Sequence, residues 1–307
     1  MTNTFAYLGP RGTFAEAAIN QLAAAQGQIL VPAESVPSAL AMVRSGEVAG
    51  ALVPIENSVE GAVPTTLDGL SHGSTLEIVA EIAIPVEFSL LVRAGTKLSD
   101  IKRIATHPHA HAQCLEWLSN NLPGVHVLPA MSTAIAASDL SDGANFDAAI
   151  AARVAADYYK LEVLAENIGD SDSAWTRFVL VQKPGHAQPA TGNDKTTVSL
   201  FMFENHPGAL QEILTEFTVR GIDLTRVESR PTKRQLGDYF FSIDFEGHID
   251  DERVGEALKG LHRICADVKF LGSYARHDHI AEPVKTAVNN ESFIEADEWL
   301  AKIRKRI

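Results

Sequence analysis

Residues 49–61 read Ala-Gly-Ala-Leu-Val-Pro-Ile-Glu-Asn-Ser-Val-Glu-Gly, and this stretch indicates the architecture of the first part of the chain. The apolar run at 49–53 is bounded by Gly and Pro, which predicts a buried strand. The chain then turns at Pro54 and presents two carboxylates, an amide and a hydroxyl within residues 56–60. Loops at strand ends in α/β sheets gather polar groups around a crevice. We therefore expect either a ligand-binding loop here or a polar turn that caps the next helix.

Strands and helices alternate on both sides of this stretch. Short apolar runs predict strands at 5–8, 29–31, 104–105, 125–128, 148–151 and 178–181, with helical segments between most of them. Such alternation predicts a mostly parallel sheet, here in two α/β lobes. The apolar stretch 76–92, broken near Pro85, is too long for one ordinary strand and predicts a crossing between the lobes. The second lobe is expected at about 86–165.

The pattern changes after residue 183. Residues 184–195 are rich in Pro, Gly and small polar residues and predict a linker. The order βαββαβ follows over residues 196–275 and is typical of a ferredoxin-like α+β unit. From residue 276 to 307 we expect a C-terminal tail, with Phe293, Ala296, Leu300 and Ile303 at the spacing of one amphipathic helix. The first domain is expected to span residues 1–183.

Composition excludes several classes of protein. The 307 residues carry a net charge of -13 and 46% hydrophobic residues, which argues for a globular protein and against nucleic acid as the main partner. The two cysteines lie far apart, so neither a disulfide framework nor a structural zinc site is expected. No secretory signal and no run of 18 apolar residues is present, which predicts a cytoplasmic protein with no membrane partner.

Three groups of polar residues are candidates for chemistry. His107 and His111 are four residues apart and could hold a metal on a helix, but no third ligand is nearby, so we expect no metal site. Ser132-Thr133 is either a helix cap or a cap that also donates to a carboxylate. Thr176-Arg177 offers a hydroxyl beside a fixed cation, which suits a carboxylate, but a surface turn explains the pair equally well.

Seven short stretches fall in one order along residues 4–275. They are Gly9–Phe14 with Glu16, Val53–Gly61, Thr106–Pro108 with Gln113-Cys114, Ser132–Ala134, Thr176–Phe178, His206–Leu210 and Glu228–Pro231. In this order they resemble the monofunctional prephenate dehydratases, a family with a C-terminal ACT regulatory domain. Two positions depart from the family pattern: His109 replaces a common glutamine and Ala174 an asparagine. No role is assigned to these two positions.

The resemblance implies conversion of prephenate to phenylpyruvate, with loss of water and carbon dioxide, in L-phenylalanine biosynthesis. It implies a bilobal catalytic domain resembling type II periplasmic binding proteins. Formation of an aromatic ring drives the reaction, so no cofactor is expected. The family's essential threonine corresponds to Thr176, which donates a hydrogen bond to the departing hydroxyl. Glu56 or Glu60 either polarises Thr176 or only braces the loop. The residues expected to bind prephenate are Thr13, Glu56, Asn57, Ser58, Gly61, His107, Ser132, Thr133, Arg177 and Phe178.

The ACT domain implies feedback control by L-phenylalanine, bound at a subunit interface of a homodimer or homotetramer. The residues expected at this allosteric site are His206, Gly208, Ala209, Leu210, Glu228, Ser229, Arg230 and Pro231. Two other functions share parts of this pattern. An arogenate dehydratase has every motif quoted, and a comparison of the rates on prephenate and arogenate would distinguish the two activities. A non-catalytic amino-acid-sensing binding protein is the other, and the intact Thr176–Phe178 stretch argues against it.

Overall fold

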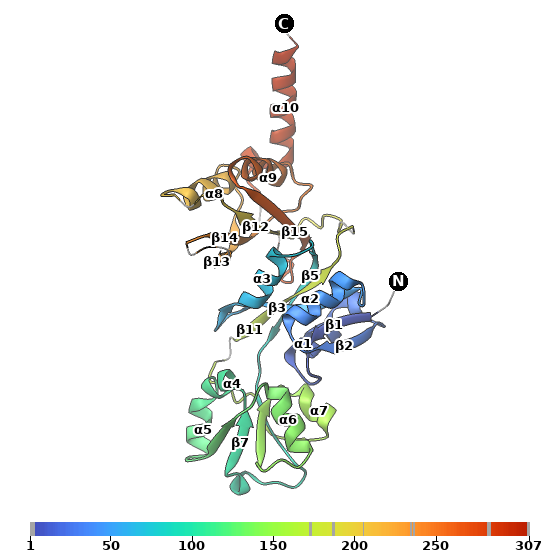
Figure 1. Ribbon diagram of the computed structural model, residues 1–307, viewed down its shortest axis with the longest axis vertical. Helices are drawn as coiled ribbons and strands as arrows, with labels where there is room; N and C mark the ends of the chain where they lie inside the picture. Colours follow the sequence, from blue (N-terminus) through green and yellow to red (C-terminus); the bar gives the residue numbers. More distant parts are fainter. Residues whose placement is uncertain are drawn as a thin grey trace. The chain divides into compact units, whose positions relative to one another are not determined.

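Figure 1 shows the computed structural model of the chain, which describes residues 4–171, 174–185, 188–204, 206–233, 235, 237–280 and 284–305. The chain forms two compact units, residues 1–63 with 82–178 and residues 64–81 with 179–307. The predicted fold class is confirmed, since the structure contains two α/β lobes and a ferredoxin-like module. Among the residues described, no helix is long and apolar enough to cross a membrane.

The first lobe is built on a sheet with the strand order β2-β1-β3-β11-β5. β1 (Thr4–Leu8) runs parallel to both β2 (Ile29–Ala33) and β3 (Gly50–Asn57), so each connection needs a crossover. These crossovers are made by α1 (Phe14–Gln21), followed by the short η1 (Ala23–Ala25), and by α2 (Val36–Ser45). The remaining strands are β4 (Gly61–Ala62), which pairs with β3, and the long β5 (Glu77–Pro85) and β11 (Trp175–Gln182).

The second lobe has a five-stranded sheet with the order β10-β6-β9-β7-β8. β7 pairs in parallel with β8 and β9, as expected, but β6 pairs antiparallel with β9 and β10. The sheet is therefore mixed, because β6 enters directly from the first lobe without a preceding crossover helix. The strands and helices are β6 (Ser89–Val92), η2 (Leu98–Asp100), β7 (Arg103–Thr106), α4 (Pro108–Ala112), α5 (Leu115–Asn121), β8 (His126–Pro129), α6 (Thr133–Ser141), β9 (Ala148–Ala151), α7 (Val154–Tyr159) and β10 (Glu162–Ala165).

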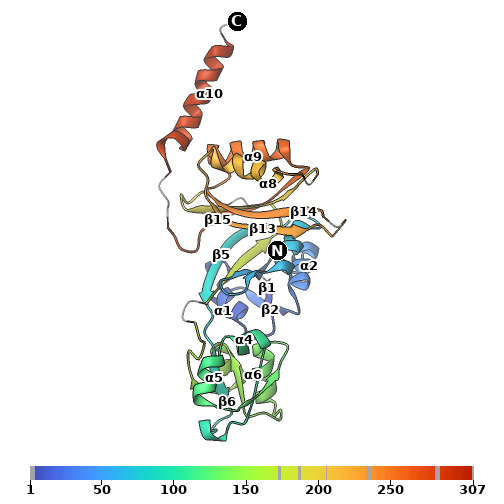
Figure 2. The ribbon, with the colours of Figure 1, turned by 90° about the vertical axis from the view of Figure 1, so that its left-hand side faces the viewer.

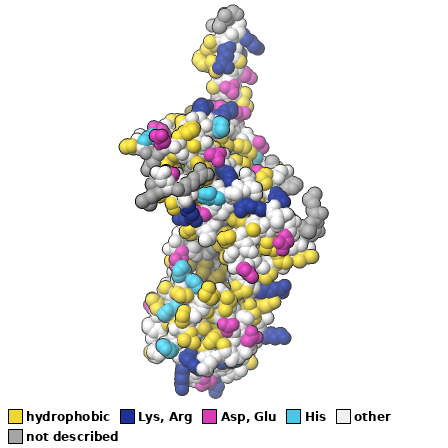
Figure 3. Space-filling model, viewed as in Figure 1, with side chains coloured by type: hydrophobic (Ala, Val, Ile, Leu, Met, Phe, Trp, Pro, Cys, Tyr) yellow, Lys and Arg dark blue, Asp and Glu magenta, His cyan; other side chains and the backbone are white. Residues whose placement is uncertain are grey.

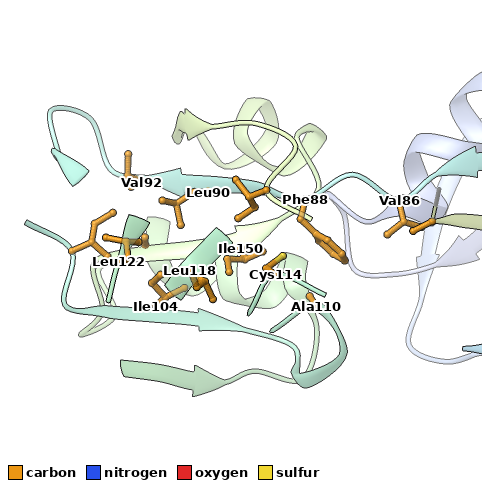
Figure 4. Close-up of a cluster of buried hydrophobic side chains, with 14 residues drawn as sticks. Val86, Phe88, Leu90, Val92, Ile104, Ala110, Cys114, Leu118, Leu122 and Ile150 are labelled. Carbon is orange, nitrogen blue, oxygen red and sulfur yellow. The ribbon is translucent and has the colours of Figure 1, made fainter. Parts of the chain in front are cut away.

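A buried apolar cluster holds this lobe together (Figure 4). Leu90, Ile104 and Ile150 come from three neighbouring strands and are fully buried against α5. The cluster continues to Phe88, whose ring meets Phe14 of α1 edge-on with 5.7 Å between centroids. Since Phe14 belongs to the first lobe, this contact joins the cores of the two lobes.

The ferredoxin-like module is a four-stranded antiparallel sheet with the order β13-β14-β12-β15. Its helices cover one face, and Figure 2 shows both of them above the strands. Val198, Ile243 and Phe217 belong to the core between the sheet and the helices. The bounds are β12 (Asp194–Phe201), α8 (Ala209–Thr218), β13 (Leu224–Pro231), β14 (Tyr239–Glu246), α9 (Glu252–Ile264), β15 (Asp267–Ala275), η3 (Thr286–Val288) and α10 (Asn290–Arg304).

The other face of this sheet is polar and yet buried, because residues 64–81 cover it. Those residues include α3 (Pro64–Ser71), whose Ser71 hydroxyl lies 2.7 Å from the hydroxyl of Ser199 on β12. Lys195 donates to both carboxylate oxygens of Glu81 at 3.1 Å. Buried polar groups need such partners. The alternation of β12, with Val198 and Leu200 toward the helices and Lys195 and Ser199 toward residues 64–81, thus fits two covered faces.

Two predicted strand boundaries were wrong. β3 does not end at Val53 but continues through Pro54 to Asn57. Its register with β1 ends at Leu52, so the missing N–H of Pro54 removes no hydrogen bond from that ladder. β11 begins at Trp175 and not at Phe178, so Thr176 and Arg177 are strand residues. Both functional segments are therefore held by a sheet.

The buried ion pair between Arg226 and Asp244 gives a stability prediction. Arg226 donates from Nε and Nη2 to the two carboxylate oxygens of Asp244, at 3.0 and 2.6 Å, and both side chains are almost fully buried. Asp244→Ala leaves a buried guanidinium without its main partner, which costs about 3–5 kcal/mol. We expect urea-induced unfolding of the module at a clearly lower midpoint. The exposed pair of Glu256 and Lys259 is the control, and Glu256→Ala should leave the midpoint unchanged. Equal midpoints for both variants would contradict this account.

Candidate active site

A β-hairpin formed by β3 and β4 carries the first group of site residues. Asn57 pairs with Gly61 and Glu56 with Ala62, so residues 58–60 form the turn. The Asn57 Oδ1 atom accepts hydrogen bonds from the N–H groups of Val59 and Glu60, at 2.8 and 2.9 Å. Gly61 has φ of +82°, a conformation that glycine adopts without steric cost. The turn therefore fixes the side chain of Asn57.

The fixed amide of Asn57 reaches Thr176 of β11. Because Oδ1 accepts from two backbone N–H groups, the orientation of the amide is defined and Nδ2 points the other way. Nδ2 donates to Thr176 Oγ1 at 2.9 Å, and Thr176 is buried. A hydroxyl that accepts at its oxygen directs its own proton to a different group. Thr176 is thus oriented as a hydrogen-bond donor.

Arg177 and Glu56 form an ion pair next to this contact. The Nε atom of Arg177 donates to Glu56 Oε2 at 3.0 Å, and the arginine side chain is 8% exposed. Pairing at Nε fixes the plane of the guanidinium, whose two Nη atoms extend beyond the contact. Phe178, the next residue of β11, is buried. Glu56 therefore braces Arg177, and the group that hydrogen-bonds Thr176 is the Asn57 amide.

Ser58 fastens the hairpin turn to β11. Its N–H donates to the carbonyl of Trp175 at 2.9 Å, and its hydroxyl accepts from the N–H of Trp175 at 2.9 Å. Residues 117 positions apart in the chain are thereby held side by side. Glu56, Asn57, Ser58, Thr176 and Arg177 consequently form one connected group, the hairpin–strand cluster. This cluster is where we expect chemistry.

Thr13 caps α1 at the end of the glycine-containing loop 9–12. Its hydroxyl accepts from the N–H of Glu16 at 3.3 Å and donates to the carbonyl of Leu8 at 3.1 Å. The carboxylate of Glu16 in turn accepts from the phenol of Tyr7 at 2.9 Å. Burial and this hydrogen bond to Glu16 raise the pKa of Tyr7, so the phenol stays protonated. The loop is therefore held by local hydrogen bonds, and Thr13 uses its hydroxyl within it.

His107 and His109 lie on the second lobe at the start of α4. His107 caps this helix, because its Nδ1 accepts from the N–H of His109 at 3.3 Å. Burial lowers the pKa of His107, the positive charge of His109 lowers it further, and Glu60 opposes both. His109 Nδ1 lies 3.6 Å from the Glu60 carboxylate at the hairpin turn. The second lobe therefore reaches the hairpin through His109, a residue to which the sequence assigned no role.

Ser132 and Thr133 begin α6. Ser132 caps the helix by accepting from the N–H of Ile135 at 3.0 Å, and Thr133 is the first helical residue. Both side chains are partly exposed. The structure thus shows the capping role, and their role toward a carboxylate stays a prediction.

Three contacts near the site, made by Tyr158, Tyr159 and Gly12, could not be predicted from the sequence. The phenol of Tyr159 on α7 donates to the carbonyl of Arg11 at 2.9 Å, which ties the second lobe to the loop before α1. Gly12 is needed there because a Cβ would lie 3.1 Å from the ring of Tyr159. The guanidinium of Arg11 also lies 5.4 Å from the centre of the Tyr158 ring. Two adjacent tyrosines on a short helix do not indicate, in the sequence alone, that they contact the loop before α1.

The residues expected at the allosteric site fall into two groups within the ferredoxin-like module. His206 and Ala209 line a cavity of about 350 Å³ together with Phe203, Glu212 and Ile213. Gly208 precedes α8 with φ of +96°, and Leu210 is partly exposed. Glu228, Ser229, Arg230 and Pro231 lie on β13, an edge strand, and do not line this cavity. The fold of one chain does not bring the two groups together.

Arg230 has a partner on α3. Its Nε and Nη2 donate to the two carboxylate oxygens of Asp68 at 3.1 and 3.2 Å, and Lys233 Nζ lies 2.7 Å from the same carboxylate. Burial alone would raise the pKa of Asp68, but the hydrogen bonds from Arg230 and Lys233 outweigh it and lower the pKa. In this structure Arg230 therefore holds the helix that follows the hairpin.

No three His, Cys, Asp or Glu side chains lie close enough to hold a metal ion in the part of the chain that the structure describes. The triplet His107, His109 and His111 accordingly does not form such a group.

Comparisons with known proteins match both parts of the chain. The family model described as prephenate dehydratase matches residues 5–186, and the ACT domain model matches residues 196–263. A curated prephenate dehydratase from Amycolatopsis methanolica is 48% identical over 301 residues, which is 98% of this chain and 97% of the relative.

Solved structures agree with these matches. A crystal structure of prephenate dehydratase from Arthrobacter aurescens, in complex with L-Phe, is 49% identical with a TM-score of 0.94 and covers 98% of this chain and 99% of its own. A second structure, described as a novel type of quorum quenching acylase, is 30% identical with a TM-score of 0.81 over 90% of this chain and 100% of its own. The family match over more than half of the chain and the curated relative over nearly all of it agree. The chain therefore belongs to the prephenate dehydratase family, with an ACT domain after the catalytic region.

Proposed function

We propose that the hairpin–strand cluster is the catalytic centre of this chain and that Thr176 is its hydrogen-bond donor to the leaving group. The reaction is that of the family: prephenate becomes phenylpyruvate, with loss of water and carbon dioxide, by a carbon–oxygen lyase. The observation that carries the proposal is the 2.9 Å hydrogen bond from Asn57 Nδ2 to Thr176 Oγ1. It orients the hydroxyl proton of Thr176 away from Asn57.

The reaction needs such a donor at one atom. As the bond to the departing carboxylate breaks, its electron pair moves into the ring, and the ring becomes aromatic when the C–O bond to the hydroxyl breaks. Hydroxide is a poor leaving group, so a proton or a strong hydrogen bond must reach its oxygen, and help of this kind is worth roughly 10²–10⁴ in rate. The bond from Asn57 draws electron density from Thr176 Oγ1, which strengthens Thr176 as a donor.

Arg177 is the residue we assign to a carboxylate of the substrate. Prephenate carries two carboxylates and this chain has a net charge of -13, so local cations must offset the overall field. Arg177 is buried and braced by Glu56 at Nε, which limits the orientations of its guanidinium. A guanidinium held in this way binds a carboxylate with little loss of side-chain entropy.

The other predicted substrate residues surround this centre in our proposal. Ser58 and Gly61 shape the hairpin turn, and Phe178 offers packing beneath it. Thr13, His107, Ser132 and Thr133 each stand at a helix N-terminus, where backbone N–H groups favour an anion. We assign the catalytic domain to residues 1–183, the linker to 184–195, the ACT domain to 196–275 and the tail to 276–307.

Regulation by L-phenylalanine is the second part of the proposal. The similar structure from Arthrobacter aurescens is a complex with L-Phe. The cavity lined by His206 and Ala209 has an apolar part at Ile213 and a carboxylate at Glu212, which suit an aromatic ring and an ammonium group. We propose that the effector binds there and that Glu228–Pro231 of a second copy completes the site. This arrangement requires a homodimer or homotetramer, and we assign the enzyme to the cytoplasm.

Thr176→Ala tests the catalytic assignment. It should lower kcat at least about tenfold, because the leaving hydroxyl loses its donor. Prephenate binding, measured by calorimetry, should persist because Arg177 is unchanged. Thr176→Ser keeps the hydroxyl and is the control. The absorbance of phenylpyruvate gives the rates with prephenate, and the formation of L-phenylalanine gives the rates with arogenate. A near wild-type kcat for the alanine variant would remove Thr176 from this role.

Asn57→Asp tests the orientation of the Thr176 hydroxyl. The carboxylate still accepts from the N–H groups of Val59 and Glu60, so the hairpin turn is kept. The second carboxylate oxygen replaces the donating Nδ2 and can only accept, so the hydroxyl of Thr176 then donates its proton to residue 57. We expect kcat to fall by about 10²-fold. In the Thr176→Ala background the same substitution should change kcat little, and an undiminished effect there would show that Asn57 acts without Thr176.

Ala209→Leu tests the effector site. Ala209 lines the cavity, so a larger side chain should fill part of it and raise the L-phenylalanine concentration for half-inhibition by about tenfold or more. Gln211→Leu introduces the same residue at an exposed position of α8 that does not line the cavity, and it should leave inhibition unchanged. Activity without effector should be the same in both variants. Inhibition of Ala209→Leu at the wild-type concentration would place the effector elsewhere.

A further inference from the structure

The last helix of the chain, α10, has an apolar side that the chain itself does not cover. α10 begins after Asn289, whose side chain accepts from the N–H of Ser292 at 2.9 Å. Its start is attached to α9, where the N–H of Glu252 donates to Asn290 Oδ1 at 3.0 Å. Beyond this attachment none of its residues is buried, and Trp299 is 63% and Ile303 43% exposed.

Five apolar residues lie along one side of the helix, while Ile294, 49% exposed, lies on the opposite side. At 100° per residue, Phe293, Ala296, Trp299, Leu300 and Ile303 occupy an arc of about 120°. An isolated helix of this length is marginal in water even with a favourable composition. Packing of the apolar side against a partner would add stability that the helix lacks by itself.

The charges of α10 are segregated along its length. The first half carries the carboxylates Glu291, Glu295, Asp297 and Glu298, and the last residues carry the cations Lys302, Arg304 and Lys305. Figure 3 shows this order, with magenta side chains toward the start of the helix and dark blue ones toward its end. Two copies in antiparallel orientation place the acidic half of each beside the basic half of the other.

The apolar positions have the same symmetry. Phe293 and Ile303 lie five residues before and after position 298, and Ala296 and Leu300 lie two residues before and after it. In an antiparallel pair centred on 298, Phe293 of one copy therefore faces Ile303 of the other, and Ala296 faces Leu300. Glu295 and Lys302 lie on the same flank of the arc, three residues before and four after the centre. They meet at almost the same level across the pair.

We propose that α10 is an interaction surface for a second copy of this chain, with which it forms an antiparallel helix pair centred on residue 298. The contact is self-complementary, as a two-fold axis requires. A membrane surface fits less well, since helices that bind it carry a predominantly basic polar face. The proposal concerns assembly and stands independently of the catalytic roles assigned above.

Hydrogen exchange of residues 290–304 in the full-length protein tests the pairing. Wild-type amides in this helix should be protected. Glu295→Lys gives like charges on both sides of the predicted contact, and so does Lys302→Glu, so each variant alone should exchange at least about tenfold faster in this segment. When the two variants are co-expressed with different tags and isolated as a mixed oligomer, both contacts regain opposite charges. Protection should then return to the wild-type level.

Glu116→Lys on α5 makes the same charge reversal at an exposed position of the second lobe and is the control, with no expected effect on α10. Dehydratase activity should be unchanged in all these variants, which separates this test from the catalytic one. Three results would overturn the proposal: an unprotected wild-type helix, full protection in both single variants, or failure of the mixed oligomer to regain protection. Protection that appears only when phosphatidylserine vesicles are added would assign α10 to a membrane surface instead.

Discussion

The hydrogen bond from Asn57 to Thr176 is the contact on which the candidate active site depends. It joins residues 119 positions apart, and it exists because β3 and β11 belong to one sheet. The turn of the β3–β4 hairpin fixes the amide through two backbone N–H groups, and the amide in turn fixes the hydroxyl. The hydroxyl of Thr176 is thereby oriented to donate its proton away from Asn57.

The hairpin is also the segment that leads directly into the regulatory part of the chain. It ends at Ala62, and α3 begins at Pro64. Through Asp68, α3 is held by Arg230 of β13, and through Ser71 it contacts Ser199 of β12. The module is therefore bonded to the segment that directly follows the β3–β4 hairpin in the chain.

Local sequence patterns were good predictors of the elements and weaker predictors of their ends. The apolar runs and helical stripes gave nearly all strands and helices, because burial on one side enforces those periods. The ends of β3 and β11 were missed because pairing with a neighbour, and not local preference, extends both strands past Pro54 and back to Trp175. The motifs gave the family, which the comparisons confirm.

The sequence by itself determined the order of most elements and the family, since periodicity and motifs are local properties of the chain. Only the tertiary structure decided what each polar side chain does. Glu56 and Glu60 are alike in the sequence, yet one braces Arg177 and the other lies beside His109. The sequence pointed to Asn57 as a substrate ligand, and the structure adds that its amide donates to Thr176. The reason is physical: a side chain's role is set by partners more than a hundred residues away, which only folding brings within hydrogen-bond distance.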